Sequence, residues 1–240
     1  MESDYSEFNL DESLARIDDI LKSEDKNYAD QTSIPARASL TFNNGFYVSC
    51  SALFVDMRGS KALSEKYNHP TLARISQSYI SELVAIMRDN KKIAEISIEG
   101  DCVWGVFDTP LKVDIDAVFS TAAQAASMID ILNIHYKRKG YPQITVGIGM
   151  AYGETLMIKA GQKSSGVNEV AWLGKLVGEA AQLCSFGNRT YTDKRLMISS
   201  VFQQNLNDKN KAMLSYNQAR GCYHANVINT ELDKWVSANK

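Results

Sequence analysis

The stretch SALFVDMRGS, residues 51–60, decides how we interpret this chain: an apolar run ends in a carboxylate, Asp56, and leads into a glycine-containing turn. The stretch EGDC, residues 99–102, repeats this arrangement, because Asp101 follows a glycine between two more apolar segments. An ionised carboxylate beside a hydrophobic core costs several kcal/mol unless it is paired or bound to a metal ion. Two such carboxylates at the ends of neighbouring strands therefore predict a site for divalent cations.

A pair of carboxylates of this kind suits the chemistry of a nucleoside triphosphate. The ribose 3′-hydroxyl is a weak nucleophile, and two bound cations can lower its pKa and neutralise charge on the phosphates. We expect Asp56 and Asp101 to hold two divalent cations, Mn2+ or Mg2+, with the backbone carbonyl of Met57 as a further oxygen ligand.

The turn after Asp56 has the composition of a phosphate-binding site. A glycine there lets backbone amides approach phosphate oxygens at the start of a helix, and the amides concerned are those of Arg58, Gly59 and Ser60. The alternative hypothesis is that Asp56 only caps this helix and that Asp101 is an ordinary turn residue. The presence of both aspartates favours the metal site.

Composition limits the classes of protein to which the chain can belong. It has 240 residues, 45% of them hydrophobic, which is enough for one large domain, and its net charge of −2 gives no indication of nucleic-acid binding. Residues 1–30 hold ten acidic and three basic residues, a net of −7, so the remaining 23 basic and 18 acidic residues leave the body at +5. A mildly basic body suits a polyanionic small substrate.

The sequence also bears on cellular location. We find no basic-then-apolar N-terminus and no apolar run of about 18 residues, so we expect neither a signal peptide nor a membrane span. The four cysteines are far apart and form no C-x-x-C pair, as expected for free thiols in a reducing compartment. We therefore predict a cytoplasmic protein.

Residues 1–37 are predicted to form an N-terminal helix and a linker. The helix is indicated by four apolar residues at spacings of four, three and four: Leu10, Leu14, Ile17 and Leu21. Residues 22–37 are polar and include a proline, and we expect them to be the linker. The helix is expected to dock on the body, with packing against a second copy of itself as the alternative.

Residues 38–240 are predicted to form one α+β domain in which hairpins alternate with long helices. We expect a first hairpin from segments 40–42 and 46–55, turned by Asn44 and Gly45, and a second hairpin at 93–107 with Asp101 at its tip. The other expected strands are 144–151, 155–158, 196–199 and 221–227. The expected helices are 60–67, 70–90, 114–139 and 174–186.

Four segments resemble the class III nucleotide cyclases. FVDMRGS at 54–60 is similar to the family's first metal-binding motif, F-x-D-[IM]-x-G-[FS], and EGD at 99–101 is similar to the second, with the two aspartates at matching spacing. GIGMAYGE at 147–154 resembles the G-I-x-x-G strand and turn, and WLGKLVGEAA at 172–181 resembles the W-G-x-x-V-N-x-A helix start. The resemblance covers about residues 45–205. It implies a ferredoxin-like catalytic domain with a mixed or antiparallel sheet and helices packed on it. It also implies a head-to-tail homodimer with two active sites at the interface.

Two positions depart from the purine cyclases of this family. Those enzymes contact the base with a lysine four residues before the second metal-binding aspartate, which is Ser97 here, and with a second residue, often aspartate, which is Ala171 here. The resemblance therefore assigns Ser97 and Ala171 to the base-binding site. A purine bound there would bury polar groups without partners, which is costly. The loss of both purine contacts has three explanations: the site binds a different base, it does not select among bases, or it is inactive.

A small cyclase that keeps both metal-binding aspartates but lacks the purine contacts resembles the pyrimidine cyclases of the bacterial Pycsar anti-phage system. Those enzymes make cyclic UMP or cyclic CMP, which activates a partner effector. The resemblance favours UTP as the substrate. A cytidylate cyclase and an adenylate or guanylate cyclase remain alternatives, and no residue distinguishes UTP from CTP.

Two further departures concern the helix that follows the base-binding strand. The family asparagine in V-N-x-A is Gly178 here, and the arginine four residues on is Gln182. The resemblance gives these positions the roles of orienting the ribose and stabilising the transferring phosphoryl group, and loss of such an arginine can cost several orders of magnitude in rate. Arg58, Lys175 and Arg189 are candidate replacements, and Lys175 is assigned to the substrate site. The non-enzyme alternative is a nucleotide-binding dimerisation module that has lost catalysis.

Overall fold

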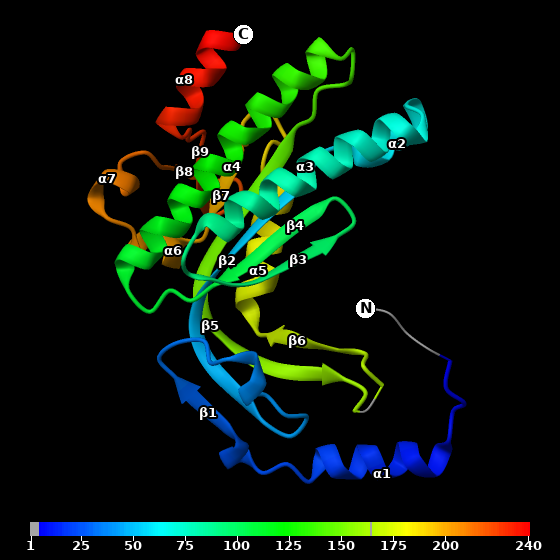
Figure 1. The fold of residues 1–240 in the computed structure, drawn as a ribbon. Coiled ribbons are helices and arrows are strands. Elements are labelled where there is room, and N and C mark those ends of the chain that lie inside the picture. Colours follow the sequence, from blue (N-terminus) through cyan, green and yellow to red (C-terminus); the bar gives the residue numbers. More distant parts are fainter. Residues whose placement is uncertain (1–4, 164) are drawn as a thin grey trace.

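The fold is built around two long antiparallel strands. In the computed structural model, which describes residues 5–163 and 165–240, β2 (Gly45–Met57) pairs along its whole length with β5 (Val146–Gly161) (Figure 1). Their register places Asp56 opposite Gly147. The distal part of β5 also pairs with β6 (Asn168–Leu173), and together they form a hairpin arm.

These strands belong to a nine-stranded mixed sheet, which confirms the predicted α+β class. The strand order is β3-β4-β2-β5-β7-β9-β8, with β1 on β2 and β6 on β5. Neighbouring strands are antiparallel except for the pairs β1–β2 and β5–β7. The remaining strands are β1 (Tyr28–Gln31), β3 (Ile93–Glu99), β4 (Cys102–Phe107), β7 (Leu196–Ile198), β8 (Ser215–Asn217) and β9 (Cys222–Ala225).

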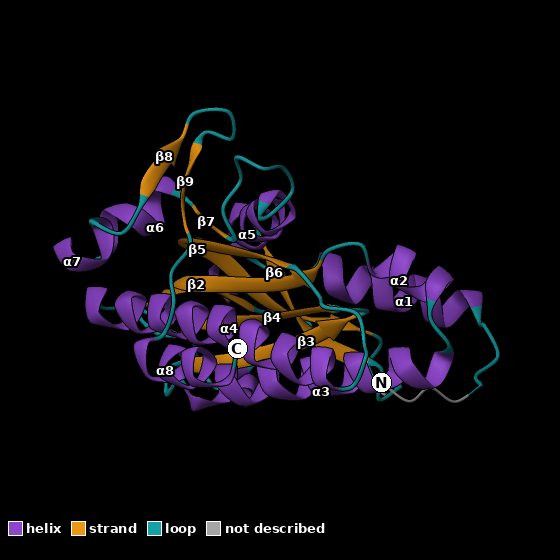
Figure 2. Ribbon diagram, turned by 90° about the horizontal axis from the view of Figure 1, so that it is seen from above, coloured by secondary structure: helices purple, strands orange, loops and turns teal. Residues whose placement is uncertain are grey.

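Helices cover the two faces of the sheet unequally. Figure 2 shows α3, α4 and α8 on one face and α5 on the other. The α5 helix packs mainly on β5 and β2, so it covers little of the β3–β4 hairpin. The helices are α1 (Leu10–Leu21), α2 (Ser60–Lys66), α3 (His69–Asp89), α4 (Lys112–Arg138), α5 (Lys175–Phe186), α6 (Ser200–Asn205), α7 (Asp208–Lys211) and α8 (Thr230–Asn239).

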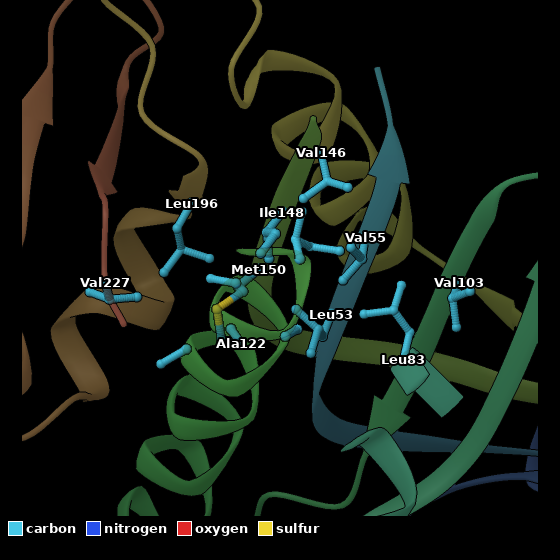
Figure 3. Packing of buried hydrophobic residues seen from close by; sticks show 14 of the residues in the cluster. Leu53, Val55, Leu83, Val103, Ala122, Val146, Ile148, Met150, Leu196 and Val227 are labelled. Carbon is cyan, nitrogen blue, oxygen red and sulfur yellow. The ribbon is translucent and has the colours of Figure 1, made fainter. Parts of the chain in front are cut away.

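Alternation along β2 divides its residues between two cores. Leu53 and Val55 belong to the larger core, on the α3 and α4 side, which Figure 3 shows together with Ile148 of β5. Phe54 belongs to the second core, on the α5 side. Asp56 therefore follows Phe54 on the face that α5 covers only in part.

Among the described residues, one helix, α4, is long and apolar enough to cross a membrane on length and composition alone. Most of its apolar stretch is buried inside the fold, and small residues such as Ala122 and Ala126 let it pack closely against the sheet. We interpret α4 as a core helix.

The hairpin predicted before β2 is wrong, because residues 40–42 form no strand. The Asn44 side chain closes this segment as a loop: its Oδ1 accepts a hydrogen bond from the Thr41 amide at 2.7 Å, and its Nδ2 donates to the Ser39 carbonyl at 3.0 Å. The start of β2 pairs instead with β1. Gly45 serves this packing, since a Cβ there would lie within 3.0 Å of three neighbouring side chains.

The N-terminal segment differs from the prediction in two ways. Part of the expected linker forms β1, which is hydrogen-bonded to β2. Helix α1 forms where predicted but buries none of its residues, and Leu10 and Leu21 are 61% and 77% exposed. The helix thus touches the body, with Asn43 Nδ2 3.5 Å from Asp19 Oδ2, but it does not bury its apolar face there as a docked helix would. Residues 1–4 of the predicted segment lie outside the described residues.

The rest of the chain follows the prediction where apolar periodicity is strong. The predicted helices at 60–67, 70–90, 114–139 and 174–186 and the hairpin at 93–107 are confirmed within a few residues. The expected strands 144–151 and 155–158 are one strand, β5, because Gly153 continues the ladder opposite Cys50. The short elements β6, β8, α6, α7 and α8 were not predicted.

An ion pair fixes the far end of the sheet and gives a testable pH dependence. Asp193 accepts hydrogen bonds from Arg220 Nε at 3.1 Å and Nη2 at 2.8 Å, with further bonds from Thr190 and Asn217, and these contacts lower its pKa from 3.8 to about 2. A depressed pKa stabilises the fold above about pH 4, and this contribution, about 2 kcal/mol, is lost as the pH falls towards 2.

We expect Asp193→Asn to lower the free energy of unfolding at pH 7 by about 2 kcal/mol and to flatten its decline between pH 4 and pH 2. Urea denaturation at several pH values measures both effects. Asp30→Asn, at an exposed position on β1, is the matched control and should keep the wild-type slope. An unchanged slope in Asp193→Asn would contradict the role of this ion pair.

Candidate active site

The structure brings together the two aspartates predicted as metal ligands. Asp56 lies at the end of β2, opposite Cys102 at the start of β4, and Asp101 precedes Cys102 in the β3–β4 turn. Both are half-buried. Burial raises the pKa of Asp56 and the negative charge of Asp101 raises it further, whereas Arg58 opposes the rise. Two acidic groups that repel each other therefore share one site.

The residues present fit divalent cations. Asp101 Oδ2 is buried and accepts no hydrogen bond from any described residue. A buried carboxylate oxygen without a partner is costly, and carboxylate and carbonyl oxygens are the ligands that Mg2+ and Mn2+ prefer. The described part of the chain holds no cluster of three or more His, Cys, Asp or Glu residues that could bind a metal ion. The remaining ligands would therefore be the Met57 carbonyl and oxygens of the substrate.

Arg58 is not available to a phosphate, which corrects its assignment to the substrate site. Its amide donates to the Thr145 carbonyl at 2.7 Å. Its guanidinium donates to the Gly187 carbonyl at 2.9 Å, to the Cys184 carbonyl, and to Asp56 Oδ2 at 2.9 Å. Arg58 therefore ties the C-terminal end of α5 to the carboxylate site, and it does not replace the missing family arginine.

A pocket of about 460 Å³ opens beside Asp101, between α2 and α3. Ser60 lines it, as do Lys61 and Ser64, which sequence reasoning missed. Gly59, immediately before α2, has φ of 70°, a left-handed conformation that glycine adopts without strain. The pocket thus combines a helix start, hydroxyl groups and an ammonium group, all of which suit phosphate oxygens.

Ser97 lies on the sheet face that carries Phe54 and Asp56. It is half-buried on β3, opposite Trp104 of β4. The Trp104 ring stacks on Phe54 with 5.0 Å between ring centroids and 3° between their planes. Ser97 therefore lies next to the Trp104–Phe54 pair, and Asp56 follows Phe54 by two residues on the same face of β2.

Ala171 does not lie on the sheet face that carries Ser97. Its neighbour Trp172 reaches across to β3, where its indole Nε1 donates to Glu95 Oε2 at 3.2 Å. Because successive residues of a strand point to opposite faces, Ala171 lies on the other side of β6. The structure thus places Ser97, Glu95 and Trp172 on one face without Ala171. Sequence reasoning missed Glu95, although its spacing of two from Ser97 puts both on one face of a strand.

The residues expected from α5 form an exposed row. Lys175, Gly178 and Gln182 are all exposed and follow one another at spacings of three and four along the helix. Arg189 is exposed just beyond the helix end. None of these four residues lines the pocket beside Asp101 within the protomer. These positions are therefore presented to solvent or to another subunit.

Comparison with known proteins agrees with this geometry. Residues 44–221 match the family model described as the adenylate and guanylate cyclase catalytic domain. The chain is 36% identical to a uridylate cyclase of Treponema porcinum, over 92% of this chain and 78% of that protein. It is 32% identical to a uridylate cyclase of Gulbenkiania mobilis, over the full length of both.

A solved structure shows the same fold. The crystal structure of the adenylyl cyclase CyaB from P. aeruginosa superposes with a TM-score of 0.61 at 19% identity, covering 72% of this chain and 85% of that one. The fold, the paired aspartates and the family match agree, and this chain belongs to the class III adenylate and guanylate cyclase catalytic-domain family.

Proposed function

We propose that this protein is a uridylate cyclase, which converts UTP into 3′,5′-cyclic UMP and pyrophosphate. The observation that carries the proposal is the similarity to two uridylate cyclases over 92% and 100% of the chain. A serine at position 97, in place of a purine-contacting lysine, supports it.

In this reaction the ribose 3′-oxygen bonds to the α-phosphorus, and the bond from that phosphorus to the oxygen shared with the β-phosphate breaks. Pyrophosphate leaves, and the hydroxyl proton passes to solvent. Asp56 and Asp101 would hold two divalent cations, Mn2+ or Mg2+, with the Met57 carbonyl as a further ligand. When bound, the cations lower the pKa of the hydroxyl and neutralise charge on the phosphates.

Triphosphate binding is proposed for the start of α2. The amides of a first helical turn have no intrahelical partner, so those of Gly59 and Ser60 are suitable donors. Lys61 lines the same pocket and adds a positive charge. Lys175 is proposed to reach the triphosphate from a partner subunit, because it is exposed and does not line this pocket within the protomer.

We propose a homodimer with two active sites at the interface, formed by residues 38–240 as the catalytic domain. Residues 1–37 are proposed as an N-terminal helix and linker. The exposed row on α5 suits a position facing a partner's carboxylates. Light scattering is expected to give twice the protomer mass of 26.7 kDa, and a monomeric mass for an active enzyme would contradict the shared site.

The proposed cellular role is the production of a second messenger in the cytoplasm. Cyclic UMP would activate a separate cyclic-nucleotide-dependent effector in defence against phage, with no binding of nucleic acid or membrane by the cyclase. The resemblance to the Pycsar cyclases supports this role.

A second candidate function is nucleotide binding without turnover. Gly178 and Gln182 favour it, because they stand where the family has an asparagine and an arginine that assist the reaction. Arg58 does not compensate, since its guanidinium is held by α5.

Initial rates with each of the four ribonucleoside triphosphates in turn, in Mn2+ or Mg2+, test the proposal. We expect cyclic UMP and pyrophosphate in equal amounts from UTP, measured by mass spectrometry and a pyrophosphate assay. A product from ATP or GTP but none from UTP would overturn the substrate assignment. UTP binding without any product would favour the second candidate.

A further inference from the structure

Glu95 links two strands that lie at opposite edges of the sheet, β3 and β6. Strands β3 and β6 are not neighbours in the sheet, yet Trp172 of β6 donates its indole hydrogen to Glu95 Oε2 at 3.2 Å. Glu95 is half-buried, and its other carboxylate oxygen, Oε1, accepts no hydrogen bond from a described side chain or amide. The Trp172 hydrogen bond thus fixes the carboxylate, and Oε1 stays free to accept a hydrogen bond.

A pocket of about 460 Å³ lies where these strands meet, and it contains both Glu95 and Trp172. Arg37 lines the same pocket, and its charge helps to keep Glu95 ionised: burial raises the Glu95 pKa, while the Trp172 hydrogen bond and the Arg37 charge oppose that rise. The pocket wall therefore offers a hydrogen-bond acceptor that an indole donor holds and a guanidinium charge helps to keep ionised.

Met157, Val170 and Trp172 of this pocket belong to the second core, so the pocket opens on the sheet face that carries Phe54 and Asp56. Glu95, Ser97 and Glu99 are alternate residues of β3, so their side chains share this face. At the usual rise of a strand, the Cα atoms of Glu95 and Glu99 lie about 13 Å apart. An extended nucleoside triphosphate can span the distance from here to the β3–β4 turn.

We propose that Glu95 determines the base specificity of the cyclase: its free carboxylate oxygen accepts a hydrogen bond from N3–H of uracil, and Trp172 positions that carboxylate. This inference rests on the proposed uridylate cyclase activity and names the residue that reads the base. An ionised carboxylate only accepts hydrogen bonds. Uracil presents a donor at N3, whereas cytosine presents an acceptor there, so the carboxylate satisfies the first and opposes the second.

The hydrogen bond from Trp172 determines which way an amide at position 95 would turn. An indole N–H only donates, so in Glu95→Gln the amide oxygen must face Trp172 and the NH2 group must face the base. The acceptor for N3–H then becomes a donor, which clashes with uracil N3–H and suits cytosine N3. In the double variant Glu95→Gln with Trp172→Phe, the amide is free to turn over and offer its oxygen to uracil again.

The experiment measures kcat/KM for UTP and for CTP in the wild type and both variants. We expect Glu95→Gln to lower kcat/KM for UTP about 100-fold or more and to raise the CTP-to-UTP ratio by a similar factor. The double variant is expected to recover at least about tenfold of the UTP activity lost. Glu154→Gln, which removes an exposed carboxylate from β5, is the matched control and should keep the wild-type ratio.

An unchanged CTP-to-UTP ratio in Glu95→Gln, with the fold intact by circular dichroism, would overturn the proposal. A double variant no better with UTP than Glu95→Gln would overturn the positioning role of Trp172. If the wild type forms no cyclic UMP, the proposed function fails instead. Equilibrium dialysis of UTP against CTP then tests Glu95 separately, since Glu95→Gln should still reverse the binding preference.

Discussion

Replacing Asp56 with asparagine is expected to lower cyclic UMP formation about a thousandfold or more. Asparagine keeps the size of the side chain and can still accept the hydrogen bond from Arg58, but it removes the charge that would hold a divalent cation. The stabilisation that bound cations give to a phosphoryl transfer amounts to several kcal/mol, and each 1.36 kcal/mol corresponds to tenfold in rate. Single-turnover assays with UTP and Mn2+ measure the loss.

The same substitution should leave the fold intact. Burial raises the pKa of Asp56, and repulsion from Asp101 raises it further, so removing the Asp56 charge relieves both effects. We expect the free energy of unfolding to stay within about 1 kcal/mol of the wild type. Asp89→Asn, at the exposed end of α3, is the control and should retain activity. Near-normal turnover by a folded Asp56→Asn variant would contradict the assignment of Asp56 as a ligand of the divalent cations.

Substituting Gly149 by alanine is expected to cause the largest loss of stability. Gly149 lies opposite Phe54 in the middle of the β2–β5 ladder, and a Cβ there would run into the Ala180 carbonyl and the Cys184 amide of α5. These are backbone atoms, so the whole helix must move. Overpacking of this kind costs about 3 kcal/mol, or about 6–12 °C in Tm for a chain of this size.

Gly153→Ala is the matched control for this prediction. Gly153 lies on the same face of β5, four residues further along, where a Cβ would meet no atom within 4 Å. Its Tm should stay within about 2 °C of the wild type. Equal Tm values for the two variants in differential scanning calorimetry would mean that α5 does not pack on β5 as closely as described.

The sequence predicts those site residues whose position is set by local pattern, at the end of a single strand or in a single turn. Asp56 and Asp101 each end an apolar run, and adjacent strands bring such ends together, so their proximity follows from local pattern. Gly59 and Ser60 are predicted for the same reason. The fold class follows from the strong periodicity of the hairpin at 93–107 and of the long helices.

The contacts that were missed join segments far apart in the chain. Arg58 is held by carbonyl groups more than 120 residues away, at the end of α5, and no local signal marks them. Glu95 meets Trp172 only because the sheet curls until its two edges approach. The wrong hairpin at residues 40–45 has a local cause: Asn44 uses its side chain to close a loop where Asn-Gly usually forms a turn.

The most direct test is a competition in which UTP, CTP, ATP and GTP are present at equal concentration with Mn2+, and the cyclic products are resolved by mass spectrometry. Wild-type protein and Asp101→Asn are compared in parallel. Cyclic UMP as the main product of the wild type, with none from Asp101→Asn, is the predicted result. A purine cyclic nucleotide as the main product, or equal cyclic UMP from both proteins, would contradict a uridylate cyclase built on Asp56 and Asp101.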